Sequence, residues 1–340
     1  MRCLIVVLNW RAVTRTVACV LSLVEHVLRN GHNIIVVNND SSQSSLEELS
    51  MALREAAPTV FRDTPGQGSD GSLYVINSGA NGGYAFGNNQ GIRWADANRI
   101  QYDAVWILNN DALVKEDALS PMLKMLTGDR QLAFVGSQIF DIEDEGLQCS
   151  GGVIGFKSIA FFWNFKGKAQ SADAKKPKQD KLVYLTGASL LVPRSTIVRH
   201  GLMDESFFLY FEEAEWQERA IRDGWRIAYC DESRIFHEKS GTVGAASAFF
   251  YYMYSRSAIL YLDKTGRPLL PVAMLWIPLL CLLKTRRLDC MTASLLGVRD
   301  AIFKSNIDWS SEFFRAVNAQ LPPRASFLDY QEGTIDGKDY

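Results

Sequence analysis

Apolar and polar residues alternate in short blocks along the start of the chain. Cys3–Leu8 is an apolar, β-branched run that ends in the polar Asn9, and Val13–Arg29 carries apolar residues at helical spacing. Asn33–Val37 is a second apolar run, and the polar segment Asn38–Ser42 follows it. This order predicts a strand, a helix and a second strand, and such βαβ units build parallel sheets. Because open α/β sheets bind ligands beyond the carboxyl ends of their strands, the polar residues there are the first candidates for a site.

The same patterning continues and predicts an α/β fold. The further predicted elements are strands at Leu73–Asn77, Ala104–Leu108, Leu182–Val192 and Arg226–Tyr229, the last leading to His237, and helices at Phe86–Ala97 and around Glu213–Arg222. A polar, basic connection lies at Phe165–Lys181. We expect it to be a solvated surface loop, and contact with anionic lipid or diphosphate is the alternative.

The chain changes character near Ala245 and becomes aromatic and then strongly apolar. Leu269–Leu283 is nearly uncharged, but it is shorter than the roughly 20 residues that span a bilayer. Pro271 and Pro278 interrupt it. The flanking basic residues are Lys264, Arg267, Lys284, Arg286 and Arg287. A helical pair on the anionic inner leaflet of a membrane fits this pattern, and a helical appendage packed on the preceding α/β domain fits it equally.

Composition narrows the classes of protein. The 340 residues are 47% hydrophobic and 22% charged, which is ordinary globular usage and excludes a disordered chain. The formal net charge of -2 supplies no electrostatic case for a nucleic-acid partner. The six cysteines are widely spaced with no CxxC pair, which indicates neither a zinc site nor a disulfide framework. The first apolar run is too short for a signal peptide, so we expect a cytoplasmic protein.

Two polar positions suggest binding of a metal and a diphosphate. Asn109-Asn110-Asp111 follows a predicted buried strand. A divalent cation stabilises a diphosphate leaving group, and Mg²⁺ or Mn²⁺ favours carboxylate, carbonyl and water ligands. Asp111 can supply the carboxylate, and Asn109 can orient ribose or metal-bound water; an ordinary polar turn is the alternative. His237 precedes a loop of small residues able to approach a phosphate, and a structural histidine is the alternative.

An acidic segment suggests a general base. Three carboxylates, Glu212, Glu213 and Glu215, follow an aromatic cluster and begin a predicted helix. A sugar hydroxyl must lose a proton as it attacks the anomeric carbon, and a carboxylate beside aromatic side chains that stack on sugar rings is a suitable base. The alternative is that the acids only stabilise the helix N-terminus electrostatically.

Taken together, these segments resemble family 2 glycosyltransferases, specifically their rhamnosyltransferase-like branch, over about the first 245 residues. The order of the motifs carries the resemblance. The donor-side motifs are Leu8-Asn9-Trp10, Val37-Asn38-Asn39-Asp40-Ser41 at the V-D-N-x-S turn, Asn81-Gly82-Gly83-Tyr84-Ala85-Phe86-Gly87-Asn88-Asn89-Gln90-Gly91 at the N-x-G-F-A-x-G-N-N-x-G segment, and Asn109-Asn110-Asp111 at the D-x-D site. The acceptor-side motifs are Gly187-Ala188-Ser189, Asp204-Glu205 and Phe207-Phe208.

The resemblance implies a GT-A fold with a Rossmann-like mixed sheet and inversion at the anomeric carbon. It implies a catalytic domain at residues 1–245, with a donor half at about 1–115 and an acceptor half at about 116–245. Beyond the resemblance, we expect residues 246–340 to form a helical C-terminal region, either as a membrane-associating appendage or packed on the catalytic domain.

The resemblance also assigns roles residue by residue. Asp111 and His237 would hold the Mg²⁺ or Mn²⁺ ion, and Glu213 would be the base, with Glu212 as the alternative. The expected donor-binding residues are Asn9, Asn38, Ser41, Asn81, Gly83, Asn89, Asn109 and Asp111. The expected acceptor-binding residues are Gly187, Phe208, Tyr210 and Glu212. The chain departs from the family at Asn38, where Asp is usual, and at Glu213 and Glu215, where shorter aspartates are usual.

The partners follow from the same resemblance. It implies dTDP-L-rhamnose as the sugar donor and a lipid-linked glycan or growing polysaccharide as the acceptor, at the inner face of a bacterial cytoplasmic membrane. A non-catalytic glycan-binding or scaffold descendant of the fold is one alternative. A nicotinamide dehydrogenase is another, since Gly83, Gly87 and Gly91 suggest a dinucleotide loop, but that loop should directly follow the first strand, which ends here without glycine.

Overall fold

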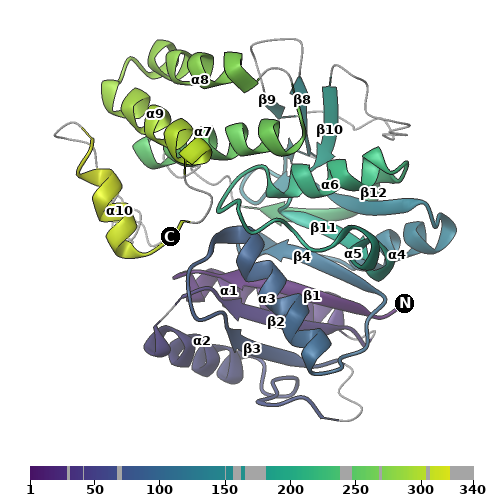
Figure 1. The fold of residues 1–340 in the computed structure, drawn as a ribbon. Helices are drawn as coiled ribbons and strands as arrows, with labels where there is room; N and C mark the ends of the chain where they lie inside the picture. Colours follow the sequence, from purple (N-terminus) through teal and green to yellow (C-terminus); the bar gives the residue numbers. More distant parts are fainter. Residues whose placement is uncertain are drawn as a thin grey trace. The chain divides into compact units, whose positions relative to one another are not determined.

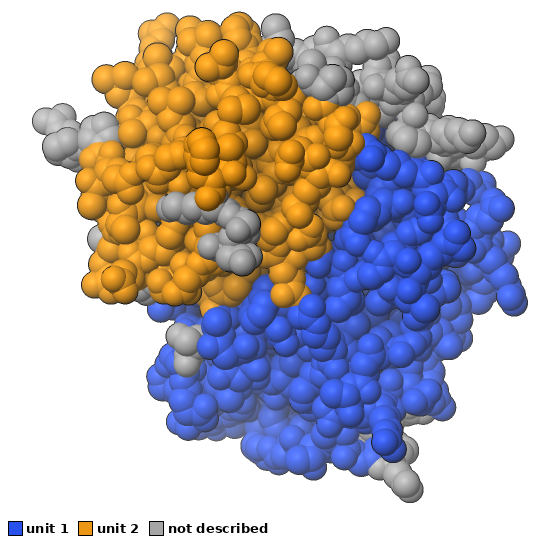
Figure 2. Space-filling model, viewed as in Figure 1, with its two compact units in different colours: residues 1–80, 86–203, 216–239 blue, residues 81–85, 204–215, 240–340 orange. Residues whose placement is uncertain are grey.

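The computed structural model describes residues 1–28, 31–40, 42–66, 71–149, 151–155, 162–164, 181–237, 247–267, 270–303 and 307–321. The chain forms two compact units (Figure 2). Unit 1 comprises residues 1–80, 86–203 and 216–239, and unit 2 comprises residues 81–85, 204–215 and 240–340. The predicted roles of Ser41 and of the basic connection at 165–180 lie outside the described residues, as does Leu269. The domain boundary expected near Ala245 also lies outside them and stays a prediction.

Unit 1 contains a large mixed sheet (Figure 1). Its strands follow the order β3-β2-β1-β4-β11-β6-β12-β5. The first four strands are parallel: β1 (Cys3–Asn9), β2 (Asn33–Asn38), β3 (Leu73–Asn77) and β4 (Ala104–Asn109). β1 and β2 are buried along nearly their whole length, as expected for parallel strands covered on both faces. The βαβ pattern of the sequence is thereby confirmed.

The rest of the sheet is mixed. Its strands are β11 (Ser189–Pro193), β6 (Leu132–Asp141), β12 (Arg226–His237), β5 (Ala112–Leu113) and β7 (Leu147–Cys149). β11 runs antiparallel to both β4 and β6, whereas β12 runs parallel to β6 and antiparallel to β5. A separate antiparallel sheet contains β10 (Lys181–Leu185), β8 (Gly151–Gly155) and β9 (Phe162–Asn164). The mixed α/β sheet predicted from the sequence is confirmed.

Two predicted strands have different limits. The single strand predicted at Leu182–Val192 is wrong, because the chain turns at Gly187-Ala188 and forms β10 and β11 in two different sheets. The strand predicted at Arg226–Tyr229 continues to His237 as β12, past a shift in register between Cys230 and Arg234. A bulge of this kind interrupts the apolar pattern without ending the strand.

Helices pack on both faces of the large sheet. The helices are α1 (Val13–His26), α2 (Gln43–Ala56), α3 (Gly83–Ala97), α4 (Leu119–Gly128), α5 (Arg194–His200) and α6 (Glu212–Arg222). Buried residues of α1, α2 and α4 share one core with Ile5 and Val7 of β1. On the other face, a Cβ at Gly91 of α3 would lie only 2.8 Å from Val6. Glycine there lets α3 approach the sheet closely.

Unit 2 contains four helices at its C-terminal end among the described residues (Figure 1). They are α7 (Ala248–Lys264), α8 (Leu270–Thr285), α9 (Leu288–Phe303) and α10 (Ser311–Asn318). α7 packs extensively against α9, and Gly297 makes this possible because a Cβ there would overlap the Tyr252 carbonyl oxygen. The C-terminal helices expected from the sequence are therefore present. Within the described parts of the chain, no helix is both long and apolar enough to cross a membrane.

Candidate active site

Asparagines lie at the carboxyl ends of the four parallel strands. The strand register aligns Asn9 with Asn38 and Asn38 with Asn77, while Asn109 is paired with Leu8. This edge is where open α/β sheets bind ligands. The structure therefore brings three predicted donor-binding residues, Asn9, Asn38 and Asn109, to one edge of unit 1.

A hydrogen-bond network sets the orientation of these amides. The Asn9 Oδ1 accepts from the Ala12 backbone N–H (3.4 Å) and from the Thr16 hydroxyl (2.8 Å). Because a backbone N–H can only donate, these contacts identify Oδ1 and leave Nδ2 of Asn9 to donate to Asn38 Oδ1 (3.1 Å). The Ser45 hydroxyl donates to the same Asn38 oxygen (3.2 Å). Asn38 is thus held in one orientation by two donors.

The network leaves the side-chain amide nitrogen of Asn38 without an acceptor among the described residues. Its Nδ2 is buried and has no hydrogen-bond acceptor among the described residues. An unpaired buried donor costs about 1–3 kcal/mol, so this atom is a candidate partner for an acceptor on a bound ligand. An aspartate, the usual residue of the family at this position, would present an acceptor here, which makes Asn38 a chemically distinct substitution.

Asp111 and His237 form the candidate metal site. Asp111 lies in the turn between β4 and β5, and His237 is the last residue of β12. The β5–β12 pairing places His237 opposite Ala112, directly after Asp111. His237 Nε2 consequently lies 2.9 Å from Asp111 Oδ1. The sheet thus joins two residues that are distant in the sequence.

The donor set of this pair fits a divalent cation. Asp111 Oδ1 is buried and accepts no hydrogen bond within the described structure, even though Nε2 lies so close. A carboxylate oxygen and an imidazole nitrogen are ligands that Mn²⁺ accepts, and Mg²⁺ favours the carboxylate. No third His, Cys, Asp or Glu joins them among the residues that the structure describes. Substrate oxygens and water would have to supply the remaining ligands.

Two of the predicted donor-binding residues have packing contacts. Asn89 is fully buried in α3, and its Nδ2 donates to the Met203 carbonyl (2.8 Å), just before the acidic segment. In unit 2, Gly83 has a φ of 89°, and a Cβ there would overlap the carbonyl oxygen of Phe208. These contacts explain why the motif carries Asn and Gly; ligand binding by these residues stays a prediction.

The remaining predicted residues have separate surroundings. Asn81 accepts from the Gly83 backbone N–H (3.2 Å) in unit 2, and Gly187 lies in the turn between β10 and β11. Phe208 is buried and packs on Trp309, with 4.5 Å between ring centroids. The ring of Tyr210 lies 5.5 Å from that of Phe250. Acceptor binding by these residues stays a prediction.

The loop that precedes α6 is strained. Tyr210 and Phe211 have φ values of 71° and 72°, the left-handed region that non-glycine residues rarely adopt. Such residues cost of order 1–3 kcal/mol each and persist only where the surroundings hold them. Glu212 and Glu213 follow immediately, so the strain sets the direction in which α6 begins.

Contacts within unit 2 hold this loop in place. Helix α7 provides three of them: Lys264 Nζ to Asp204 Oδ2 (2.7 Å), Arg256 to the Ser206 carbonyl (2.9 Å) and Ser257 to the Leu209 carbonyl (2.8 Å). The Tyr84 backbone N–H provides a fourth by donating to the Phe208 carbonyl (2.8 Å). The carboxylate of Asp204 and three backbone carbonyls of the loop are thus held by hydrogen bonds or an ion pair before α6 begins.

Arg256 is a functional candidate that sequence reasoning missed. Its side chain is only 1% exposed and lies over the Trp309 ring, 4.7 Å from the centroid. The available signal was a single charged residue inside the aromatic and apolar run that begins at Phe249. Burying a guanidinium costs free energy, and among the described residues no carboxylate forms an ion pair with Arg256. Its hydrogen bond to the Ser206 carbonyl argues that it positions the loop before α6.

Glu212 and Glu213 differ in their surroundings. Glu212 is 4% exposed, and its Oε2 has no hydrogen-bond partner within the described residues. Burial first, and the charge of Glu213 second, raise the pKa of Glu212 well above its ordinary value. Glu213 is only partly buried. Between the two, Glu213 is the more exposed residue, although its Oε2 is also buried.

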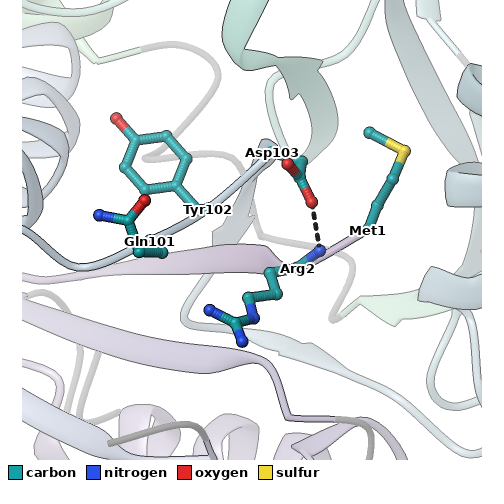
Figure 3. Close-up of a pocket in the computed structure, with 5 residues that line it drawn as sticks. All are labelled: Met1, Arg2, Gln101, Tyr102 and Asp103. Atoms are coloured by element: carbon teal, nitrogen blue, oxygen red, sulfur yellow. Dashed lines mark hydrogen bonds between the residues drawn. The ribbon is translucent and has the colours of Figure 1, made fainter. Parts of the chain in front are cut away.

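A separate hollow of about 500 Å³ lies at the other edge of the sheet. It is lined by Met1, Arg2, Gln101, Tyr102 and Asp103 (Figure 3), which precede β1 and β4. The Arg2 backbone N–H donates to Asp103 Oδ2 there (2.7 Å). Because the asparagines and Asp111 follow these strands, the hollow is not part of the candidate site.

Comparisons with known proteins identify a matching family and two related transferases. Residues 5–173, about half of the chain, match the family described as Glycosyl transferase family 2. The low-salt glycan biosynthesis hexosyltransferase of Haloferax volcanii is 25% identical over 224 residues, 64% of this chain and 70% of that protein. The N-acetylglucosaminyl-diphospho-decaprenol L-rhamnosyltransferase of Mycobacterium tuberculosis is 28% identical over 87 residues, 26% of this chain and 28% of that protein.

Two solved structures share the fold. A mannosyltransferase from Pyrobaculum calidifontis, in complex with GDP-Man and Mn²⁺, has a TM-score of 0.53 at 15% identity over 94% of this chain and 79% of that one. GalNAc-T7 with UDP, GalNAc and Mn²⁺ has a TM-score of 0.50 at 15% identity over 70% of this chain and 43% of that one. The family match confirms the resemblance seen in the sequence and excludes the dehydrogenase alternative. The chain belongs to glycosyl transferase family 2 and is a glycosyltransferase with the GT-A fold.

Proposed function

We propose that this glycosyltransferase is a metal-dependent, inverting enzyme that transfers a hexose from a nucleotide sugar to a lipid-linked or polysaccharide acceptor. The observation that carries the proposal is the Asp111–His237 pair at the carboxyl edge of the sheet, with 2.9 Å between Oδ1 and Nε2. The matched relatives are named as a hexosyltransferase of glycan biosynthesis and a rhamnosyltransferase, which supports the substrate class.

The pair would hold Mg²⁺ or Mn²⁺, and the bound ion would offset the negative charge that develops on the leaving nucleoside diphosphate. Asp111 would supply a carboxylate oxygen, and His237 would supply Nε2. The asparagines at the strand ends would orient the nucleoside. In particular, the unsatisfied Nδ2 of Asn38 would donate to an acceptor on the base or ribose.

Glu213 would act as the base that takes the proton from the acceptor hydroxyl. A general base must be ionised at the working pH. The raised pKa of Glu212 keeps that carboxyl protonated further toward neutral pH, so it is the weaker candidate for the role. The clamped loop before α6 would hold Glu213 in one position, which general-base catalysis requires.

We propose dTDP-L-rhamnose as the sugar donor. The support is the named L-rhamnosyltransferase, which matches only 26% of this chain, together with the motif order in the sequence. That relative is named for a diphospho-decaprenol acceptor, which supports a lipid-linked acceptor and work at the inner face of the cytoplasmic membrane.

A screen of nucleotide sugars with and without Mn²⁺ tests the proposal, read as thermal stabilisation and as release of nucleoside diphosphate. We expect dTDP-L-rhamnose to stabilise the protein only with Mn²⁺, and EDTA to abolish diphosphate release. Asp111→Asn should remove both effects while the unliganded protein unfolds near the wild-type temperature. Asp231→Asn, an exposed acid on the same strand as His237, is the matched control and should behave as wild type.

The outcomes separate the alternatives. Full turnover in EDTA would contradict a metal-dependent mechanism. Stabilisation by a nucleotide sugar without any turnover on lipid-linked or polysaccharide acceptors would favour the non-catalytic descendant. A response to another nucleotide sugar would replace rhamnose and leave the rest of the proposal standing.

A further inference from the structure

Helix α8 exposes four large apolar side chains. Leu275 is 79% exposed, and Val272, Leu279 and Leu283 are exposed on the same helix. Their spacing of three, four and four residues places them on one face. The opposite face, which includes Ala273, Ile277 and Cys281, is buried in unit 2. We call the four exposed residues the α8 stripe.

The composition of α8 explains why the stripe is not an ordinary surface. From Leu270 to Leu283 the helix carries no charged residue. A helix of a water-soluble protein normally has a polar outer face, and one that is apolar all round is either buried or in contact with lipid. The inner face of α8 is covered by protein, so the outer face requires a second covering.

The length of α8 determines how a bilayer could cover it. Its 16 residues extend about 24 Å, which is less than the ~30 Å hydrocarbon core of a bilayer. Pro278 also lies inside the helix, which adds a break to its hydrogen bonding. These properties fit a helix that lies in the plane of the lipid–water interface with one face immersed.

The charges at the end of α8 identify the kind of surface. Lys284 and Arg286 are exposed, and no acidic side chain pairs with either among the described residues. The next cation, Arg287, is neutralised by Asp289, with 3.1 Å between Nε and Oδ1. Two unneutralised cations therefore follow the stripe directly in the sequence, at the C-terminal end of α8. Anionic phosphate headgroups complement this pattern, whereas a neutral apolar partner would leave both cations unused.

We infer that α8 binds the surface of an anionic lipid bilayer, with the α8 stripe in the interface and Lys284 and Arg286 on the headgroups. The exposure of the α8 stripe and the charges that follow it are the evidence for this lipid-binding surface. Its use, which is to bring a lipid-linked acceptor to the enzyme, rests on the proposed function.

Flotation of the full chain with vesicles tests the inference. Vesicles of phosphatidylcholine are compared with vesicles that also contain phosphatidylglycerol. We expect binding only to the second kind, and we expect it to weaken with salt. Replacing both cations (Lys284→Gln with Arg286→Gln) should lower the partition coefficient about 30-fold at low salt, since each basic residue near such a surface contributes roughly fivefold.

The apolar contribution has a matched pair of variants. Val272→Ser lies in the stripe, whereas Val198→Ser on α5 changes an equally apolar residue that is 77% exposed. We expect Val272→Ser and Leu275→Ser to reduce vesicle binding about tenfold or more, on the scale of burying one aliphatic side chain. Val198→Ser should bind as wild type. Thermal unfolding of all variants should match wild type, because the altered side chains are exposed.

The results that would overturn the inference are specific. Equal binding by Val272→Ser, Leu275→Ser and Val198→Ser would show that the stripe does not touch lipid. A dimer in light scattering that Leu275→Ser converts to a monomer, without vesicle binding by either, would assign the stripe to a second copy of the chain. Nucleotide-sugar hydrolysis is followed in parallel and should be unchanged in the stripe variants, so a failed lipid surface and a failed transferase are distinguishable.

Discussion

Replacing Glu212 by Gln should stabilise the protein, and increasingly so as the pH rises. Glu212 is buried at the start of α6, and burial together with the charge of Glu213 raises its pKa well above the ordinary 4.5. In the unfolded chain the same group ionises near 4.5. Above that pH, folding therefore requires Glu212 to take up a proton, and this uptake costs stability. Glutamine has nearly the same shape and needs no proton.

The sign and the slope follow from proton linkage. For a carboxyl whose pKa is raised on folding, the native state binds more protons than the unfolded state between the two pKa values. Stability is then greatest below about 4.5 and falls as the pH rises toward the folded pKa, by about 1.4 kcal/mol for each pH unit. The free-energy difference between Glu212→Gln and wild type should grow by that amount per unit across this window and then level off.

The assay is urea unfolding of both proteins at a series of pH values, followed by tryptophan fluorescence. Titrating groups that do not interact with Glu212 are common to the two proteins and cancel in the difference. Glu116→Gln, at an exposed carboxylate in unit 1, is the matched control and should show no growth of the difference with pH. A difference that stays flat with pH, or a variant that becomes relatively less stable as the pH rises, would refute the reasoning. Transfer activity should survive the Glu212→Gln substitution.

Three further predictions concern the base and the loop that positions it. Glu213→Gln should lower kcat by about 10²–10⁴-fold at nearly unchanged donor affinity, measured at saturating nucleotide sugar. If Glu213→Gln instead keeps near wild-type kcat while Glu212→Gln loses it, the base is Glu212. Arg256→Met should lower the free energy of unfolding in urea by about 2–3 kcal/mol, because a charge-assisted hydrogen bond to the Ser206 carbonyl is lost. Arg256→Lys should recover part of this loss. Equal stability of all three proteins would count against a role of Arg256 in holding the loop before α6. Gly83→Ala should destabilise by at least about 1–2 kcal/mol, since φ is 89° and the Phe208 carbonyl fills the space, whereas Gly66→Ala, which meets no atom, should be close to neutral.

Several features of the fold were predictable because they depend on short stretches of chain. The spacing of apolar residues over residues 3–38 predicted the order β1, α1 and β2, and an asparagine is the last residue of each of these two strands. The glycine-rich motif was recognised by resemblance. Its physical reason appeared only in the packing, where Gly91 lets α3 reach Val6 and Gly83 accommodates the Phe208 carbonyl.

Other features escaped prediction because pairing between strands is not encoded locally. An apolar run from Leu182 to Val192 looks like one strand, but its two halves pair in different sheets, β10 with β8 and β11 with β4 and β6. Arg256 escaped for a related reason. A lone arginine in an aromatic helix suggests a surface position, and only the contacts with Ser206 and Trp309 show why it is buried.

The sequence by itself determined which residue types stand at the ends of the strands and at the start of α6, since these depend on periodicity and motif order. The tertiary structure alone decided which of them meet. Asp111 and His237 come within 2.9 Å because β5 pairs with β12, a contact between distant parts of the chain. Likewise, the adjacent Glu212 and Glu213 differ in solvent exposure, because folding buries Glu212 more deeply and thereby raises its pKa. Proximity and solvent exclusion arise from the packing of remote segments, and a local pattern carries no information about either.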